Sequence, residues 1–251
     1  MTQQLHELES VRPRRRRARV TSLSIGLTLV VILIAMALLA PWLAPFDPNV
    51  QTINQRLLPP SALHWFGTDG FGRDLLSRVI YGARPTLLLV SLILVLTIPV
   101  GLLVGITAGY VGGWTERVLM RITDIFLSLP NLVIALALRR SDYLAAARMQ
   151  GITGLRLMFG HILPLCLPTA VVRAALSLGG IILSAAGLGF LGMGVQPPTA
   201  EWGSMVAEGS KVIFDQWWVA AAPGAAILFA SLAFNLTGDG LRDRLDTRHA
   251  K

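Results

Sequence analysis

The sequence holds few residues that could carry out chemistry. Cys166 is the one cysteine among 251 residues, so neither a disulfide framework nor a cysteine metal site is expected. The four histidines are scattered, and no HExxH pattern or grouped serine, histidine and aspartate indicates a hydrolytic centre. The GxxxxGK[ST] loop that binds ATP phosphates is also missing. We therefore expect no enzyme activity, no metal site and no cofactor bound by this chain.

Charge is scarce as well. Charged residues make up 14% of the chain and hydrophobic residues 53%, which is too apolar for an ordinary soluble domain. The apolar residues fall in blocks of roughly 20, the length of helix that crosses a hydrocarbon core of about 30 Å. The sequence predicts an all-α, polytopic bundle of transmembrane helices with five apparent spans, at residues 20–43, 86–110, 119–138, 168–190 and 217–236.

The net charge of +8 lies on the tails and the short loops. Residues 1–19 form a basic tail whose arginines, Arg12 to Arg19, directly precede the first span, and such residues hold cytoplasmic ends of membrane proteins. Nucleic-acid binding is the rival interpretation of this run. It is disfavoured because no aromatic residues are interleaved there to stack on bases. We expect a multi-pass membrane protein with a cytoplasmic N-terminus.

A polar loop, residues 45–85, should follow the first span on the outside. Within it, the stretch from His64 to Asp74 places two glycine turns between aromatic and charged residues. The glycine spacing fits no phosphate-binding loop, and no strand precedes it. The residues alone predict a turn held by Asp–Arg contacts near the membrane surface. The motif positions are Gly67, Thr68, Asp69, Gly72, Arg73 and Asp74.

The third span carries two charged residues. Arg121 and Asp124 are three residues apart on one helical face, so they can pair and shield each other from lipid. A carboxylate inside the membrane is a functional candidate by default. These two lie close to the end of the span, which favours a structural pair.

A polar and basic segment, residues 141–164, separates the third and fourth apolar runs. Ser141 can cap one short helix and Thr153 a second, with Gly151 as a left-handed corner between them. Two short helices at a glycine corner make a compact knob that suits protein docking, although an ordinary connecting loop is the simpler alternative. The candidate docking residues are Ala145, Ala146, Ala147, Gly151, Ile162, Leu163 and Pro164.

This segment resembles the EAA loop of binding-protein-dependent ABC importer permeases. That loop reads Glu-Ala-Ala, three residues, Gly, nine residues, then Ile-x-Leu-Pro, and Ala145 departs from it where the family often has glutamate. The GTDxxGRD stretch at 67–74, the run 105–130 and the segment 194–203 resemble the dipeptide, oligopeptide and nickel permeases of the same family. The chain is therefore identified as similar to their C-type subunit.

The resemblance implies a permease domain over residues 20–246 of an ATP-driven importer in the bacterial inner membrane. The implied cargo is a peptide or a related small solute such as nickel or glutathione. The implied partners are a homologous permease subunit, two ABC ATPase subunits that hold ATP and magnesium, an extracytoplasmic solute-binding protein and membrane lipids. A secondary, ion-coupled transporter is the alternative; it needs a mid-membrane carboxylate or broken helices at matched positions, and Asp124 is its only candidate.

The number of spans conflicts with this assignment. Five spans with a cytoplasmic N-terminus would put Arg139, Arg140, Arg148 and Arg156 outside, against the positive-inside bias, and would turn the 141–164 knob away from ATP. One further span between Leu138 and Arg139 removes both faults. The family has a helix there, six in all. We therefore expect about one helix with its flanks to be absent from this chain after Leu138.

Overall fold

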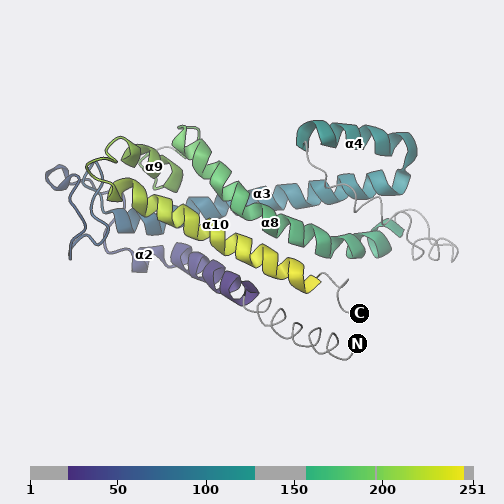
Figure 1. The fold of residues 1–251 in the computed structure, drawn as a ribbon, viewed down its shortest axis with the longest axis horizontal. Helices are drawn as coiled ribbons and strands as arrows, with labels where there is room; N and C mark the ends of the chain where they lie inside the picture. Colours follow the sequence, from purple (N-terminus) through teal and green to yellow (C-terminus); the bar gives the residue numbers. More distant parts are fainter. Residues whose placement is uncertain (1–21, 128–156, 196, 246–251) are drawn as a thin grey trace, which may run out of the picture. The chain divides into compact units, whose positions relative to one another are not determined.

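The computed structural model of the chain describes residues 22–127, 157–195 and 197–245. Within these ranges the secondary structure is helical, apart from one isolated bridge between Thr68 and Asp74, so the all-α expectation is confirmed (Figure 1). The chain divides into two compact units, Met1–Leu92 with Ala175–Lys251 and Ile93–Ala174, which are described separately.

Three helices of the described chain are long and apolar enough to cross a membrane. They lie at Leu75–Ala108, Cys166–Phe190 and Trp218–Arg244, inside α3 (Leu75–Val111), α8 (Leu163–Phe190) and α10 (Trp218–Leu245). A shorter apolar helix, Ser22–Leu38, precedes them and is followed after a bend at Leu39 by α2 (Ala40–Leu43). Pro41 stands in the first turn of α2, where its missing N–H is not needed. The expected first span is thus two helical pieces.

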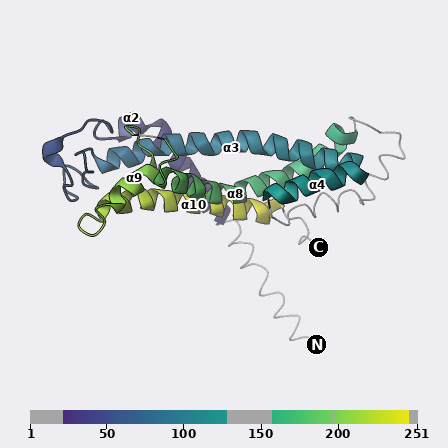
Figure 2. The same ribbon diagram turned by 90° about the horizontal axis from the view of Figure 1, so that it is seen from above.

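The first helix and α10 approach each other through glycines. A Cβ atom at Gly26 would lie 2.5 Å from the backbone nitrogen of Thr237, and one at Gly240 would lie 2.5 Å from Leu23 Cβ. Small residues allow helices to pack this closely in lipid. Because the residue numbers rise in one helix as they fall in the other, the two helices are antiparallel, and both views show them side by side (Figures 1 and 2). Ser22 and the C-terminal part of α10 therefore lie at the same end.

The other two long helices continue this alternation. Arg84 Nε donates to Ala37 O over 2.7 Å, and Phe46 N donates to Ser77 Oγ over 3.1 Å, so α3 begins beside α2 and runs back along the first helix. The hydroxyl of Ser231 donates to Gly179 O over 3.3 Å. A Cβ atom at Gly238 would lie 2.8 Å from Leu176 N, which makes α8 antiparallel to α10.

The first helix, α3, α8 and α10 alternate in direction within the first unit, so the start of the first helix and the end of α10 lie at the same end. The expected five spans are not tested by these contacts, because most of the third one lies outside the described residues. In the second unit, Ile106 of α3 packs with Leu157 and Ile162, and Leu102, Tyr110, Leu163 and Cys166 surround them. The chain leaves α3 and enters α8 at one place.

The third expected span, 119–138, lies partly outside the described residues. Its described part belongs to α4 (Gly113–Leu127), which follows α3 at Gly112; Gly112 and Gly113 have φ of 63° and 62°. The residues after Leu127 lie outside the described ranges, so the third span stays a prediction.

Two boundaries also differ from the sequence-based expectation. The helix α3 starts at Leu75, so residues 75–85 of the expected outer loop are helical; Asp74 Oδ2 accepts from Ser77 N over 2.7 Å and fixes this start. The helix α8 begins at Leu163 after a π-helical turn, Met158–Ile162, and Pro168 lies inside it. Membrane helices tolerate such a proline because neighbouring groups satisfy the freed backbone.

The stretch between the expected spans 168–190 and 217–236 contains a helix that the sequence analysis missed, α9 (Trp202–Ser210). Glu201 caps it, because its carboxylate accepts from Gly203 N over 2.8 Å and from Ser204 N over 2.7 Å. Trp202, Met205 and Gly209 are buried at helical spacing, which was the available signal in the sequence.

Candidate functional site

Buried polar side chains gather where the loop before α3 meets the first turns of that helix. All of these side chains belong to the first unit, at the end of its helices that lies away from Ser22. Each is less than a tenth exposed, which is unusual for charged residues and requires that they satisfy one another. The members of this outer polar cluster are His64, Thr68, Asp69, Arg73, Asp74, Ser77 and Arg78.

Asp69 and Arg73 form the centre of the outer polar cluster. Arg73 Nε lies 2.6 Å from Asp69 Oδ2, while Asp69 Oδ1 accepts from the backbone nitrogens of Phe71 and Arg73 over 2.8 and 3.0 Å. Gly72 has φ +75°, and a Cβ there would collide with the carbonyl of Thr52. The structure thus places the Asp–Arg contact that the sequence predicted, in a turn that only glycine fits.

Two residues that sequence reasoning missed complete this ion-pair network. Arg73 Nη2 donates to Glu208 Oε2 of α9 over 3.1 Å, and Arg78 Nε lies 3.5 Å from Asp69 Oδ2. Arg78 Nη1 also donates to the carbonyls of Pro48 and Pro198 over 3.1 and 3.3 Å. Two guanidinium groups and two carboxylates therefore link the loop before α3, the first turns of α3 and α9.

His64 and Asp74 form a second pair within the cluster. His64 Nδ1 lies 2.9 Å from Asp74 Oδ1, and the Phe46 ring lies 4.9 Å from the imidazole. Asp74 Oδ2 accepts from both the backbone nitrogen and the hydroxyl of Ser77 over 2.7 Å. The described residues contain no group of three histidine, cysteine, aspartate or glutamate side chains placed to hold a metal ion. The cluster thus shows the features of a structural clamp.

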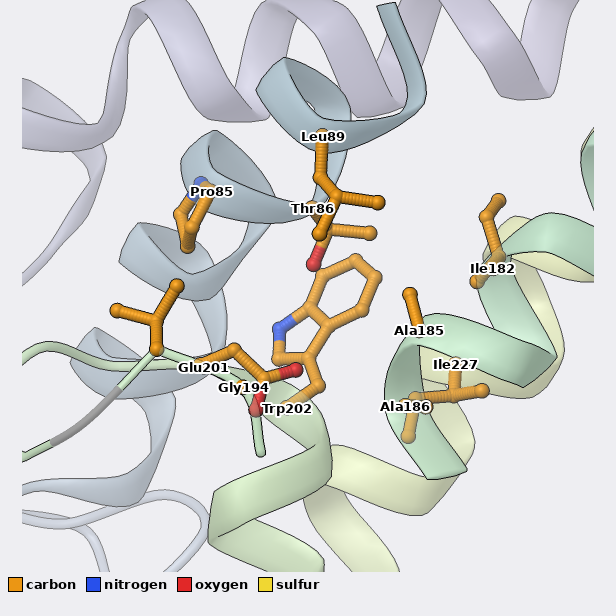
Figure 3. Close-up of a pocket in the computed structure, with 11 residues that line it drawn as sticks. Pro85, Thr86, Leu89, Ile182, Ala185, Ala186, Gly194, Glu201, Trp202 and Ile227 are labelled. Carbon is orange, nitrogen blue, oxygen red and sulfur yellow. The ribbon is translucent and has the colours of Figure 1, made fainter. Parts of the chain in front are cut away.

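A small pocket of about 30 Å³ lies beside the first turns of α9 (Figure 3). The indole of Trp202 projects between α3 and α8, and its Nε1 donates to Val79 O over 2.9 Å. A Cβ at Gly82 would lie 2.6 Å from this indole, so α3 approaches the ring through a glycine. The cavity holds no more than a few water molecules. It is lined by Pro85, Thr86, Leu89, Ile182, Ala185, Ala186, Gly194, Val195, Glu201, Trp202 and Ile227.

Most of the predicted docking knob lies outside the described residues. That applies to Ala145, Ala146, Ala147 and Gly151. Its final residues are described: Ile162 is buried, Leu163 is half-buried and Pro164 is exposed. Of the predicted intramembrane pair, Arg121 is exposed on α4, and the side chain of Asp124 is outside the description.

Comparison with known proteins gives two family matches and many relatives. Residues 22–60 match the N-terminal TM domain of oligopeptide transport permease C, and residues 135–251 match the family described as binding-protein-dependent transport system inner membrane component. The probable D,D-dipeptide transport system permease protein of Escherichia coli K12 is 42% identical over 247 residues, covering 85% of this chain and 83% of the relative. The di/tripeptide transport system permease protein of Pseudomonas aeruginosa is 41% identical over 252 residues, covering 84% and 83%.

These alignments are longer than the part of this chain that they cover. For the E. coli relative, 85% of 251 residues is about 213, so about 34 of the 247 aligned positions have no counterpart here, enough for one span of about 20 residues with its flanks. The difference agrees in size with the helix expected to be absent after Leu138. The junction of Leu138 and Arg139 itself lies outside the described residues.

Proposed function

Because this chain belongs to the family of binding-protein-dependent transport system inner membrane components, we propose that it is a permease subunit of an ATP-driven importer of peptides. One observation carries the proposal: the chain is 42% identical to a relative named for D,D-dipeptide transport, over an alignment that covers 83% of that relative. A second relative is named for di- and tripeptides. Nickel or glutathione as cargo would need the same architecture with a different solute-binding protein.

The proposed partners follow from the family to which the chain belongs. ATP and magnesium would bind to two separate ABC ATPase subunits, and the sequence agrees in having no Walker-type phosphate loop. A homologous permease subunit would complete the translocation path, and an extracytoplasmic binding protein would deliver the solute. The arginine-rich N-terminal tail favours a cytoplasmic N-terminus. This chain would then act by moving its helices, not by catalysing a reaction.

The position of the docking knob is argued from the two helices that flank it. The start of α3 carries the outer polar cluster, while the far end of the same continuous helix packs with the start of α8. The segment between α3 and α8 therefore begins and ends beside the C-terminal part of α3. If the termini are cytoplasmic, the knob faces the ATPases there, where a groove can hold a helix and transmit its movement.

The alternating direction of the four long helices also bears on the absent helix. We propose that the relatives' additional residues form a span after Leu138. In this chain, which lacks that span, residues 112–156 would begin and end on the same side of the membrane. The start and end of this segment support that proposal, because Ile106 and Tyr110 of α3 pack with Ile162 and Leu163. The arginines at 139, 140, 148 and 156 can then stay on the cytoplasmic side, as the positive-inside rule favours.

The outer loop offers a surface for the binding protein. Trp65, Phe66 and Phe71 are exposed on the segment that the outer polar cluster holds rigid, with exposed fractions of 70%, 40% and 48%. Aromatic side chains on a rigid support are typical anchors of protein interfaces. We propose docking near residues 64–74 and 196–210; surface cysteines placed there should crosslink to the binding protein.

Uptake by reconstituted vesicles tests the proposed function. The chain would be reconstituted with its permease, ATPase and binding-protein partners, and uptake of a labelled dipeptide measured with ATP supplied or an ion gradient collapsed. We expect uptake to require ATP and this chain, and to survive the ionophore. Matched vesicles that lack only this chain are the control. Uptake that continues without ATP and stops with the ionophore would instead identify a secondary transporter.

A further inference from the structure

The turn segment between α9 and α10, residues 211–217, exposes a run of large apolar side chains. Phe214 is fully exposed, Trp217 is 62% exposed and Ile213 is 43% exposed. Lys211 and Asp215 of the same segment are also exposed and carry opposite charges, with the ammonium group at the start of the segment. Apolar side chains gathered on a surface in this way indicate contact with another apolar phase or partner. This interfacial segment, Lys211 to Trp217, has no assigned role in transport.

The helix contacts fix the level of the interfacial segment along the bundle. Leu23 and Gly240 touch at the end near the termini. Counting about 1.5 Å per residue, Trp42 lies about 28 Å from Leu23, and Trp217 lies about 34 Å from Gly240 along α10. The hydrocarbon core of a bilayer is about 30 Å thick. Trp42 and Trp217 therefore both lie about one membrane thickness from the Leu23–Gly240 contact, with Trp217 about 6 Å farther along the bundle axis.

Other residues at this level have the composition of a membrane–water boundary. Trp42 is 83% exposed. Arg84, which donates to the carbonyls of Ala37 and Leu38, lies 5.1 Å from the centre of the Tyr81 ring. At the opposite end, Arg242 and Arg244 follow Gly240 directly. Tryptophan and tyrosine concentrate at membrane interfaces, and long cationic side chains extend from apolar surroundings toward the headgroups.

We propose that the interfacial segment inserts into the lipid headgroup layer on the side opposite the termini. Phe214 enters the boundary of the acyl chains, and the ammonium group of Lys211 meets lipid phosphates. The segment directly precedes Trp218, the first residue of α10, so this contact anchors the entry of α10 into the membrane. The proposal does not depend on the nature of the transported solute.

Spin-label depth measurements test this insertion. In a Cys166→Ser background, Phe214→Cys would carry a nitroxide, and the intact chain with its partner subunits would be reconstituted in vesicles of phosphatidylethanolamine and phosphatidylglycerol. Collision rates with oxygen, which concentrates in lipid, and with a water-soluble nickel chelate report depth. Val31→Cys, exposed on the first helix, is the deep control, and Ile53→Cys, exposed in the outer loop, is the aqueous control.

We expect the oxygen-to-nickel ratio at position 214 to lie between the two controls and several-fold above that of position 53. A ratio equal to that of position 53 would overturn the proposal. So would a label immobilised and shielded from both reagents, because it would show that a protein covers the segment. Lys211→Glu should move the label toward water and Lys211→Arg should not; equal depths in both variants would overturn the headgroup contact.

Discussion

Arg73 Nε and Asp69 Oδ2 lie 2.6 Å apart, and neither side chain is more than 2% exposed. They are four positions apart in sequence, and a glycine with φ +75°, Gly72, precedes the arginine. Arg78 shares the same carboxylate at 3.5 Å. The Asp69 carboxylate therefore compensates the charges of two buried cations at once. We expect it to contribute more to the stability of the outer loop than an ion pair that faces solvent does.

The first prediction concerns removal of that carboxylate. Asp69→Ala leaves Arg73 and Arg78 buried with too little negative charge, and breaking a buried pair in this way costs about 3–5 kcal/mol. We expect a markedly lower thermal stability of the subunit in detergent. Glu208→Gln should cost less, because Glu208 is 27% exposed. Asp47→Asn, on an exposed turn, is the matched control and should be neutral. Equal stability of all three variants would refute the role assigned to Asp69.

The second prediction concerns the contact of the first helix with α10. In Gly240→Ala the new methyl group would lie 2.5–2.7 Å from the backbone and Cβ of Leu23, so the helices must separate. Forcing atoms into a packed contact costs about 1–3 kcal/mol. Gly101→Ala is the control, because a Cβ there meets no atom within 4 Å. Thermal unfolding of both variants checks the prediction, and an equally stable Gly240→Ala would contradict the close approach.

The third prediction concerns the docking knob. Gly151 is predicted to occupy a left-handed corner, where valine would add strain of about 1–3 kcal/mol. Gly151→Val should lower peptide uptake strongly while the subunit still inserts into the membrane. Ala145→Glu, which restores the residue common in the family, should be tolerated. Undiminished uptake with Gly151→Val would remove the knob from the coupling mechanism.

Sequence reasoning found the apolar helices but not all of their limits. The start of α3 was missed because polar residues such as Arg78 in its first turns are read as loop, whereas here they are buried against Asp69 and two carbonyl groups. The Arg73–Glu208 contact joins residues 135 apart, a separation at which no local pattern carries information. The identity of a glycine does not tell what it faces: Gly240 contacts Leu23, whereas a Cβ at Gly101 would meet no atom within 4 Å.

The direction of the helices could not be derived from hydropathy for a related reason. A count of apolar runs treats 119–138 as a crossing, whereas the contacts of Ile106 with Ile162 return the chain to the place where it left α3. Arginine placement favours an even number of crossings, since an odd number leaves basic residues on the wrong side. This parity stays a prediction, because residues 128–156 lie outside the described ranges.

The side of the membrane on which the knob lies tests the account most directly. In the Cys166→Ser background, single cysteines at Leu5, Ala145 and Ala250 would be labelled in intact cells with a membrane-impermeant maleimide, with Ile53→Cys as the outer-loop control. We predict labelling of position 53 in intact cells and of the other three only after the inner side is opened. Labelling of position 145 or 250 in intact cells would contradict the even number of crossings and the coupling role together.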